Sequence, residues 1–278
     1  MTLRRTEAKR LATLTGNSRR REQRLQEQMV SRQSQKFERR LSREISSAMR
    51  KAADNLESGN AAPVDAIEED HRDRITTILE TLWRESGQTM AEHILGVERS
   101  WSGKIQRKNF DVRPEDIVDG LLADWIQSEG GSKIRRISRT TLSDIRGIID
   151  RGTRDGQTTD DIAKSIRSVA PQKSSNRAKT IARTETHSAN NFAAQKSAEA
   201  TGLNMVRVWV SAQGERTRSI ADGAEFDHIA ADGQQRGMNE PFVIEGVSGS
   251  EELMYPGDPA GSAANIIHCR CAVVFEME

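Results

Sequence analysis

The sequence predicts an α+β protein: an extended, mostly helical N-terminal two-thirds followed by a small C-terminal domain of a helix packed on a short antiparallel sheet. Up to about residue 201 the apolar residues recur at three- and four-residue intervals, the period of helices. After Gly202, β-branched and aromatic runs alternate with glycines, which is typical of strands and turns. The 278 residues are only 35% hydrophobic and 30% charged, which is too polar for one large globular core.

Residues 1–60 are predicted to form a basic helical arm. An apolar stripe with near four-residue spacing runs from Leu25 through Phe37 to Met49. Residues 1–51 hold 15 Lys and Arg against 5 Glu, whereas residues 213–278 hold 4 Arg against 12 acidic residues. This separation favours an arm that meets a polyanion or an acidic protein surface, and an end that avoids polyanions.

Two interpretations of this arm remain open. It is either a solvated helix whose stripe docks on a partner or on the body of the protein, or a non-specific hold on duplex DNA. No aromatic residues are interleaved to stack bases, so no single-strand reader is expected. The candidate contacts with DNA or a partner are Arg19, Arg20, Arg21, Arg24, Arg32, Lys36, Arg39, Arg40 and Arg43.

Residues 61–172 are predicted to form a helical bundle region. Gly59 and Pro63 mark a hinge before it, and residues 171–175 a linker after it. Pro114 suits the first turn of a helix that Gly130 and Gly131 end. The region has no glycine-rich phosphate loop and no His-Glu-x-x-His motif, and its lone histidines His71 and His93 are interpreted as surface or structural groups.

Residues 173–278 are predicted to form the C-terminal α+β domain. An alanine-rich helix begins near Ser174 or Ser175 and ends before Gly202, and its small residues allow a close neighbour. Strands are expected at 205–210, 242–244 and 272–275, forming one small sheet against this helix.

Cys269 and Cys271 are the only cysteines, and they lie two residues apart. On a strand they would share a face, roughly 6–7 Å apart, which is stretched for a disulfide. With His228 and one of Asp227, Asp232 or His187 they could form a tetrahedral structural zinc site that pins the loops. The alternative is that both are small buried core residues, so no cofactor is expected unless zinc binds here.

Six sequence blocks follow one another in this C-terminal region: IARTETHSANNFA, VWVSAQGERTR, HIAADGQ, EPFVIEG, YPGDP and NIIHCRC. In this order and at these distances they resemble the C-terminal domain of the phage Mu F-like minor head proteins, the head morphogenesis family of tailed bacteriophages, over about residues 177–275. Two departures are an insertion, residues 219–227, before His228, and His268 where the family commonly has Asn. The residues that match the family motif are Arg183, Glu185, Trp209, Arg216, Arg218, His228, Asp232, Gly233, Cys269, Arg270 and Cys271.

The resemblance implies a minor capsid protein of the virion, found in the head interior or at the portal vertex, and in the host cytoplasm during assembly. It implies a part in head morphogenesis and in DNA packaging or ejection, with the portal protein, a capsid or scaffold protein and double-stranded DNA as partners. The sequence has no run of 18 apolar residues and no apolar signal core, so no membrane is required and the protein is expected to stay inside the cell after synthesis.

A non-enzymatic role is expected, with a virion-carried enzyme as the alternative. That enzyme would be zinc-dependent or similar to ADP-ribosyltransferases, with Glu251 and Glu252 near Tyr255 as its acidic residues. The Ser-Thr-Ser strand and the nicotinamide-stacking aromatic of such transferases are absent from the sequence, so the two glutamates are interpreted as a solvated loop.

Overall fold

The computed structural model describes residues 16–102 and 113–277, and it divides the chain into two compact units. We call residues Gln33–Leu82 and Trp125–Glu185 the bundle unit, and residues Met1–Arg32, Trp83–Asp124 and Thr186–Glu278 the sheet unit. These boundaries fall inside helices and differ from the predicted segments 1–60, 61–172 and 173–278. The first fifteen residues of the predicted arm lie outside the described residues.

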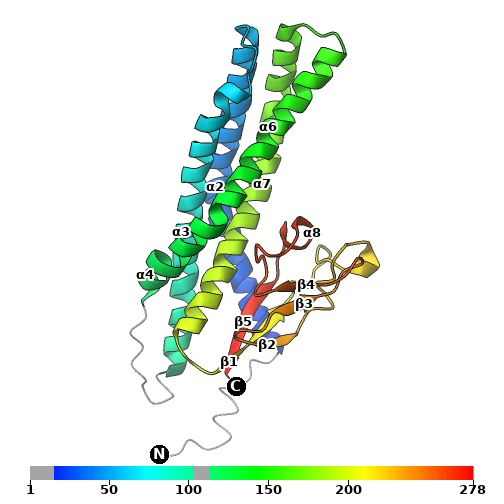
Figure 1. Cartoon of the computed structure of the whole chain (residues 1–278). Coiled ribbons are helices and arrows are strands. Elements are labelled where there is room, and N and C mark those ends of the chain that lie inside the picture. Colours follow the sequence, from blue (N-terminus) through cyan, green and yellow to red (C-terminus); the bar gives the residue numbers. More distant parts are fainter. Residues whose placement is uncertain (1–15, 103–112, 278) are drawn as a thin grey trace, which may run out of the picture. The chain divides into compact units, whose positions relative to one another are not determined.

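Long helices make up most of the chain before residue 201 (Figure 1). Pro114 is the first residue of a helical run and its predicted place is confirmed. In chain order the elements are α2 (Gly16–Glu57), η1 (Asp65–Ile67), α3 (Glu68–Ser102), α4 (Pro114–Asp116), the π-helical η2 (Ile117–Leu122), α5 (Ala123–Trp125), the π-helical η3 (Ile126–Gly130), α6 (Gly131–Arg154) and α7 (Thr159–Ala200).

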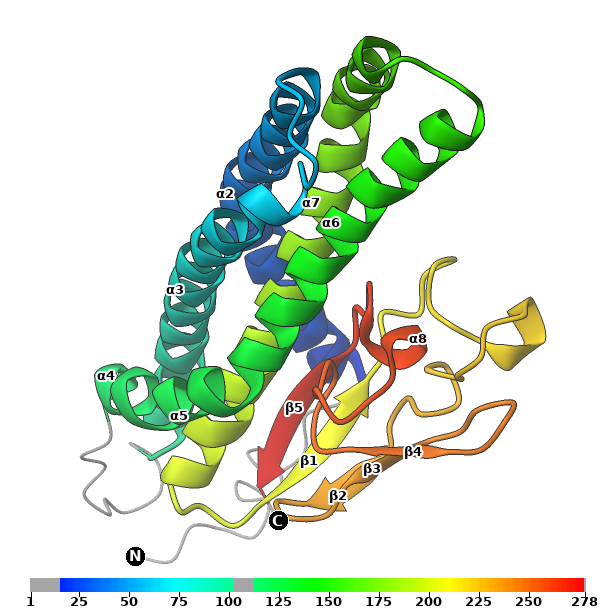
Figure 2. The same cartoon turned by 45° about the horizontal axis from the view of Figure 1, so that its top comes forward.

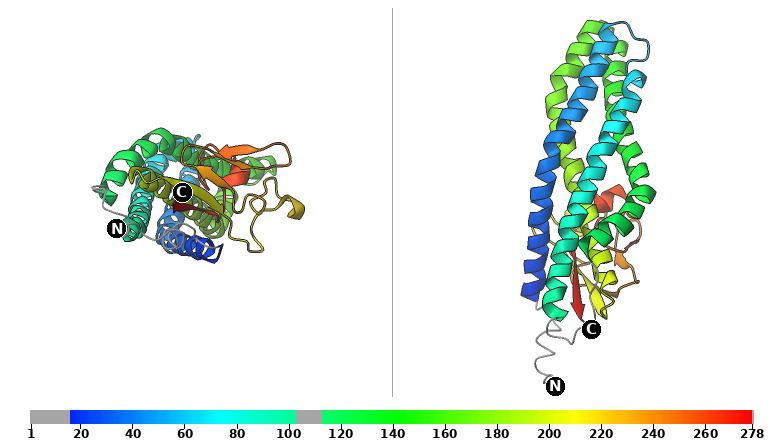
Figure 3. Two further views of the ribbon diagram at one scale, coloured as in Figure 1. Left: turned by 90° about the horizontal axis from the view of Figure 1, so that it is seen from below. Right: turned by 90° about the vertical axis from the view of Figure 1, so that its left-hand side faces the viewer.

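The bundle unit consists of parts of α2, α3, α6 and α7 that run side by side (Figures 1 and 3). The predicted apolar stripe is its core, because Phe37, Leu41, Ile45 and Met49 are almost completely buried. Buried side chains at this four-residue spacing lie on one face of a helix, and their removal from water is the main force that holds such a bundle together.

Two predicted helix ends are wrong. Gly130 and Gly131 both have right-handed helical backbone angles, and the chain is helical from Pro114 to Arg154. Pro171 lies inside α7, where a proline removes a hydrogen bond and costs about 3 kcal/mol. The helix continues through it because Ala170, Ser174 and Ala178, four residues apart, are all buried on one face.

The described residues of the sheet unit form five strands and confirm the predicted α+β class (Figure 2). The predicted strands exist, but they form two antiparallel sheets instead of one: β2-β1-β5 and β3-β4. In the larger sheet Trp209 pairs with Val273 and Val206 pairs with both Glu276 and Gly237. The elements are β1 (Met205–Val210), η4 (Ile220–Asp222), β2 (Gln235–Gly237), β3 (Phe242–Ile244), β4 (Glu251–Leu253), α8 (Ala263–Ile266) and β5 (Ala272–Met277).

Helices of the sheet unit pack against its sheet, as the alanine-rich composition of α7 predicts. The Asn191 side chain of α7 accepts a hydrogen bond from the Val273 backbone N–H of β5 at 3.2 Å. The start of α2 belongs to the same unit, and here the predicted stripe is wrong: Leu25 is 40% exposed, whereas Gln23 and Gln26 are buried. No described helix combines the length and the apolar character needed to cross a bilayer.

A candidate metal centre and the predicted contact residues

Three side chains from two distant segments of the sheet unit meet in its interior. His228 Nδ1 lies 3.3 Å from Cys271 Sγ and 3.6 Å from Cys269 Sγ. All three ligand atoms lie within 4.8 Å of one another, and each residue is at most 3% exposed. The cysteines come directly before β5, so the structure brings together the three residues predicted as ligands, with both thiols facing His228.

A chain of hydrogen bonds fixes the orientation of His228. Asn265 Oδ1 lies 2.7 Å from His228 Nε2, while the Asn265 amide group donates to Glu251 Oε2 at 3.0 Å. Burial raises the pKa of Glu251, but hydrogen bonds from Ser262 and Asn265 outweigh it and hold that pKa below its ordinary value. The carboxylate is therefore charged and only accepts, which turns the Asn265 oxygen toward His228 and places the imidazole proton on Nε2. The Nδ1 lone pair then faces the two sulfurs.

The two thiols do not ionise independently. Burial raises the pKa of Cys269, but the hydrogen bond from Cys271 and the nearby imidazoles of His187 and His228 outweigh it, so this pKa lies below its ordinary value. Burial and the neighbouring Cys269 raise the pKa of Cys271. Each thiol thus affects the ionisation of the other, because the two sulfurs lie close together in a buried site.

Several motif residues surround this cluster and explain why the sequence blocks occur together. The Trp209 ring meets the His228 ring edge-on, with 5.7 Å between centroids. Arg218 donates to the carbonyl oxygens of Asn265 and Ile267 and so holds the turn that carries Asn265. Gly257 of the YPGDP block has a φ of +83°, and a Cβ there would lie 2.8 Å from His187 Nδ1, so a larger residue would clash.

The departure at His268 also has a physical explanation. His268 has a φ of +61°, in the left-handed region that Asn adopts more readily than most residues. The Asn that is common at this position therefore suits the backbone turn before the cysteines. Histidine is among the side chains that tolerate this conformation, and the His268 side chain is exposed.

The three residues considered as a fourth ligand have other partners. Asp232 accepts from the Ser211 N–H at 2.7 Å and pairs with Arg20 at 3.2 Å. Asp227 accepts from backbone N–H groups, including that of Ala230 at 2.8 Å. His187 donates through Nε2 to the Cys271 carbonyl oxygen at 2.8 Å.

The remaining motif residues are spread over both units. In the bundle unit Glu185 pairs with Lys133, and Arg183 lies two residues before it in α7. In the sheet unit the Gly233 N–H donates to the Trp209 carbonyl oxygen at 2.8 Å, and Arg270 pairs with Glu27. Arg216 is exposed in the loop after β1.

The nine predicted basic contact residues fall into distinct groups. In the sheet unit Arg19 pairs with Glu276 and Arg20 with Asp232, so these guanidinium groups have acidic partners within the protein. In the bundle unit Lys36 and Arg40 stand over the Phe37 ring. The other five of the nine, all in α2, are exposed: Arg21, Arg24, Arg32, Arg39 and Arg43.

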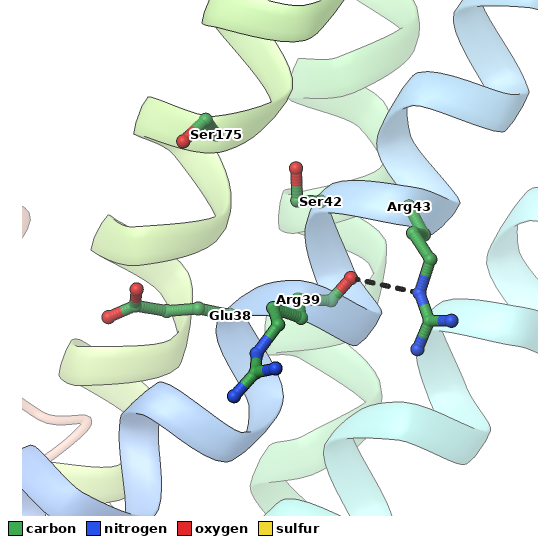
Figure 4. A pocket seen from close by; sticks show the side chains of 5 residues that line it. All are labelled: Glu38, Arg39, Ser42, Arg43 and Ser175. Atoms are coloured by element: carbon green, nitrogen blue, oxygen red, sulfur yellow. Dashed lines mark hydrogen bonds between the residues drawn. The ribbon is translucent and has the colours of Figure 1, made fainter.

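Two of the exposed arginines line an open depression of about 480 Å³ in the bundle unit (Figure 4). Arg39 and Arg43 lie on one face of α2, and Arg43 Nε donates to the Arg39 carbonyl oxygen at 3.3 Å. The hydroxyl groups of Ser42 and Ser175 and the carboxylate of Glu38 complete its lining. Basic and hydroxyl groups in this arrangement can donate hydrogen bonds to an anion.

Sequence reasoning missed two sets of residues. The first set is Asn265 and Glu251, which orient His228. Asn265 opens the NIIHCRC block but was not singled out as a site residue, and Glu251 lies between two blocks in a strand taken for a loop. Glu251 and Glu252 were expected in a solvated loop, but both belong to β4, where Glu251 accepts a hydrogen bond from Asn265. The second set is Arg135, Arg136 and Arg139, which are exposed and make α6 another basic surface. A count of the basic residues in this segment of the sequence could have found them.

The family described as phage Mu protein F like protein matches residues 143–274. No curated protein and no solved structure matches the chain significantly. The matched range includes His228, both cysteines and the strands up to most of β5. The start of α2, which packs in the same unit, lies outside it.

Proposed function

Because this chain belongs, through residues 143–274, to the phage Mu protein F-like family and is thus a phage head-related protein, we propose that it is a minor head protein that acts at the portal. It takes part there in head assembly and in DNA packaging or delivery. The single observation that carries this proposal is the family match, and the residues of several motif blocks that meet at one buried cluster support it.

The proposed role is structural and not enzymatic. Glu251, the acidic residue of the transferase alternative, accepts hydrogen bonds from Ser262 and Asn265 and so holds the turn beside His228. A structural function accounts for these contacts, because a carboxylate used in this way stabilises the fold around the cluster.

The five exposed arginines of α2 among the predicted contact residues are the proposed contacts with double-stranded DNA. Within the sheet unit Arg21, Arg24 and Arg32 are spaced by three and eight residues, which places them on one helix face. Within the bundle unit Arg39 and Arg43 lie beside two serine hydroxyls. Cations in such rows bind duplex phosphates without reading the sequence, because each contact releases counterions.

A DNA-binding assay with substituted arginines tests this contact. Deleting residues 1–51 is unsuitable, because residues 16–32 pack in the sheet unit and their loss would disturb its fold. A variant with Arg21, Arg24, Arg32, Arg39 and Arg43 all changed to Gln should bind duplex DNA more weakly at every sequence. Its plot of log affinity against log salt should flatten by about 0.9 for each phosphate that the variant no longer neutralises.

The matched control is Arg135→Gln, Arg136→Gln and Arg139→Gln on α6, which removes exposed charge elsewhere in the bundle unit. It should leave the salt slope unchanged. If the control loses binding and the α2 variant keeps it, the DNA-contacting surface is α6 and the proposal for α2 is wrong.

Association with the portal is tested by assembly. The chain is co-expressed with the portal, capsid and scaffold proteins encoded by the same phage, and heads are separated by sedimentation. We expect the chain to sediment with heads that contain the portal and to stay unbound when the portal is omitted. Equal incorporation with and without the portal would place the protein on the capsid or scaffold instead.

A further inference from the structure

The spacing of the ligand atoms in the sheet unit matches that of a metal site. A tetrahedral zinc ion with Zn–S bonds of about 2.3 Å and Zn–N bonds of about 2.0–2.1 Å places nitrogen and sulfur ligands roughly 3.6 Å apart. The His228 Nδ1 to sulfur distances are 3.3 Å and 3.6 Å. The cluster therefore requires only a small adjustment to accept such an ion.

The surroundings of His228 are those of a metal ligand. Ligating histidines usually donate their second ring N–H to an oxygen, which fixes the tautomer and the ring orientation. Here Asn265 Oδ1 accepts from His228 Nε2, and Glu251 in turn holds the Asn265 amide. A histidine that served only as core filling would not need its Nδ1 lone pair turned toward two thiols.

We propose that His228 Nδ1, Cys269 Sγ and Cys271 Sγ bind one zinc ion, with water or another small ligand in the fourth position. Binding replaces the two thiol protons, which are released to solvent, and forms two Zn–S bonds and one Zn–N bond. Thiolate and imidazole are the ligand types that zinc prefers. The ion joins the loop at His228 to the chain segment that leads into β5.

This inference is independent of the role at the portal. A chain that binds zinc could still fail to enter heads, and a chain without zinc could still enter them. The metal measurement and the assembly measurement therefore fail separately.

The first test is metal content. The full chain is expressed in zinc-supplemented medium and purified under reducing conditions without chelators, and its metals are measured by elemental mass spectrometry. We expect about one zinc ion per chain in the wild type and loss of that ion in the variants Cys269→Ser and Cys271→Ser. The matched control is His268→Asn, which removes an exposed imidazole next to the cysteines and should keep the zinc.

The second test begins with the wild-type chain, so its main result does not depend on a variant that might fail to fold. Cobalt(II) added to the wild-type chain after zinc removal should give thiolate-to-cobalt charge-transfer bands and the intense visible bands of tetrahedral coordination. Asn265→Ala should keep these bands but weaken metal affinity by about 10–100-fold, because the ring of His228 loses its fixed orientation.

Three results would overturn the proposal. One is a folded wild-type chain with reduced thiols that holds no zinc and gives no charge-transfer band with cobalt. Another is zinc that remains bound after both cysteines are replaced, which would mean adventitious surface binding. The last is a disulfide between Cys269 and Cys271 in the chain as purified from cells, which would remove the ligands.

Discussion

The side-chain amide of Gln26 donates a hydrogen bond to the carbonyl oxygen of Val273, 247 residues later, at 3.2 Å. Val273 lies in β5, which forms one edge of the three-stranded sheet. Its N–H is bound by Asn191, so side chains of α2 and α7 satisfy both backbone groups of this edge residue. Gln23 does the same for the Arg270 carbonyl oxygen at 2.8 Å. An exposed edge strand can pair with other chains, and these side chains prevent that pairing.

Gln26→Ala should weaken this edge. It leaves the buried Val273 carbonyl oxygen without its donor, which typically costs about 1–3 kcal/mol. Hydrogen–deuterium exchange of the peptide that contains β5 should therefore become faster. Gln28→Ala is the control, because Gln28 is exposed on the same helix and its replacement should leave the exchange unchanged. Equal exchange in both variants would mean that Gln26 does not hold the edge.

The charge asymmetry of the chain has a partial explanation inside the sheet unit. Arg19 binds Glu276 with two hydrogen bonds, of which Nη2 to Oε2 is 2.7 Å, and Glu276 is almost completely buried. Arg20 and Asp232 form a second pair. The acidic C-terminal region was expected to avoid polyanions. The structure shows in addition that Arg19 and Arg20, near the start of α2, neutralise two of its acidic residues.

A charge-swap experiment tests the Arg19–Glu276 pair. Arg19→Glu should destabilise the sheet unit by about 1–3 kcal/mol, because it leaves a buried carboxylate next to another one. Glu276→Arg should also destabilise it, and the double swap should recover part of the loss. The measurement is the urea midpoint of each chain, arranged as a double-mutant cycle. Additive losses would show that the two residues do not interact in solution, and Arg21→Gln on the exposed face is the neutral control.

Periodic patterns in the sequence predicted that the long helices and the main strands exist, although not where every helix ends. Phe37, Leu41 and Ile45 indicated the core face of α2, because a helix face that packs in a core needs apolar residues at three- or four-residue spacing. The same rule failed at Leu25, because the helix there meets the edge of a strand, and a strand edge needs amide donors instead of apolar contacts.

Contacts between distant segments limited the rest of the prediction. The low helix propensity of proline at Pro171 favours a break in the helix. The helix is continuous because the residues around Pro171 are packed in the core, and the sequence alone does not show this packing. The trio of His228, Cys269 and Cys271 could be proposed because metal ligands are chemically distinctive. Asn265 could not, since an asparagine has many uses and its role here follows from the position of Glu251 in space.

The pair of His93 and Glu22 should make the sheet unit sensitive to pH. His93 Nε2 lies 2.7 Å from Glu22 Oε1, and this hydrogen bond raises the pKa of His93 above its ordinary value of 6.5, although burial opposes it. Burial raises the pKa of Glu22, but the hydrogen bond and charge of His93 outweigh it, so this pKa falls below its ordinary value of 4.5.

The signs of these shifts define a window. The His93 contribution is complete below pH 6.5 and is lost as pH rises through the raised pKa, whereas the Glu22 contribution is present above pH 4.5 and is lost as pH falls. The pair therefore stabilises most between these values. His93→Gln keeps a hydrogen-bonding group that does not titrate. In this variant the difference between urea midpoints at about pH 5.5 and about pH 8.5 should shrink. An unchanged difference would assign the pH dependence to other groups.

The last prediction concerns the buried pair of Lys133 and Glu185 in the bundle unit. Lys133 Nζ lies 2.9 Å from Glu185 Oε2, and the side chains are 6% and 8% exposed. Lys133→Met should cost about 3–5 kcal/mol in unfolding free energy, because the buried Glu185 carboxylate loses the positive charge of Lys133. The double variant Lys133→Met with Glu185→Leu removes both charges and should regain most of that loss. Urea unfolding of the two single variants and the double variant measures the coupling. A loss below about 1 kcal/mol for Lys133→Met would mean that water reaches the carboxylate.

Glu185 belongs to a motif block, whereas Lys133 lies before the matched range. The double variant therefore also tests whether the glutamate at this position serves the fold or the assembly of heads. If it is stable and still enters heads, the glutamate acts through the fold. If it is stable and fails to enter them, Glu185 has a further role in assembly.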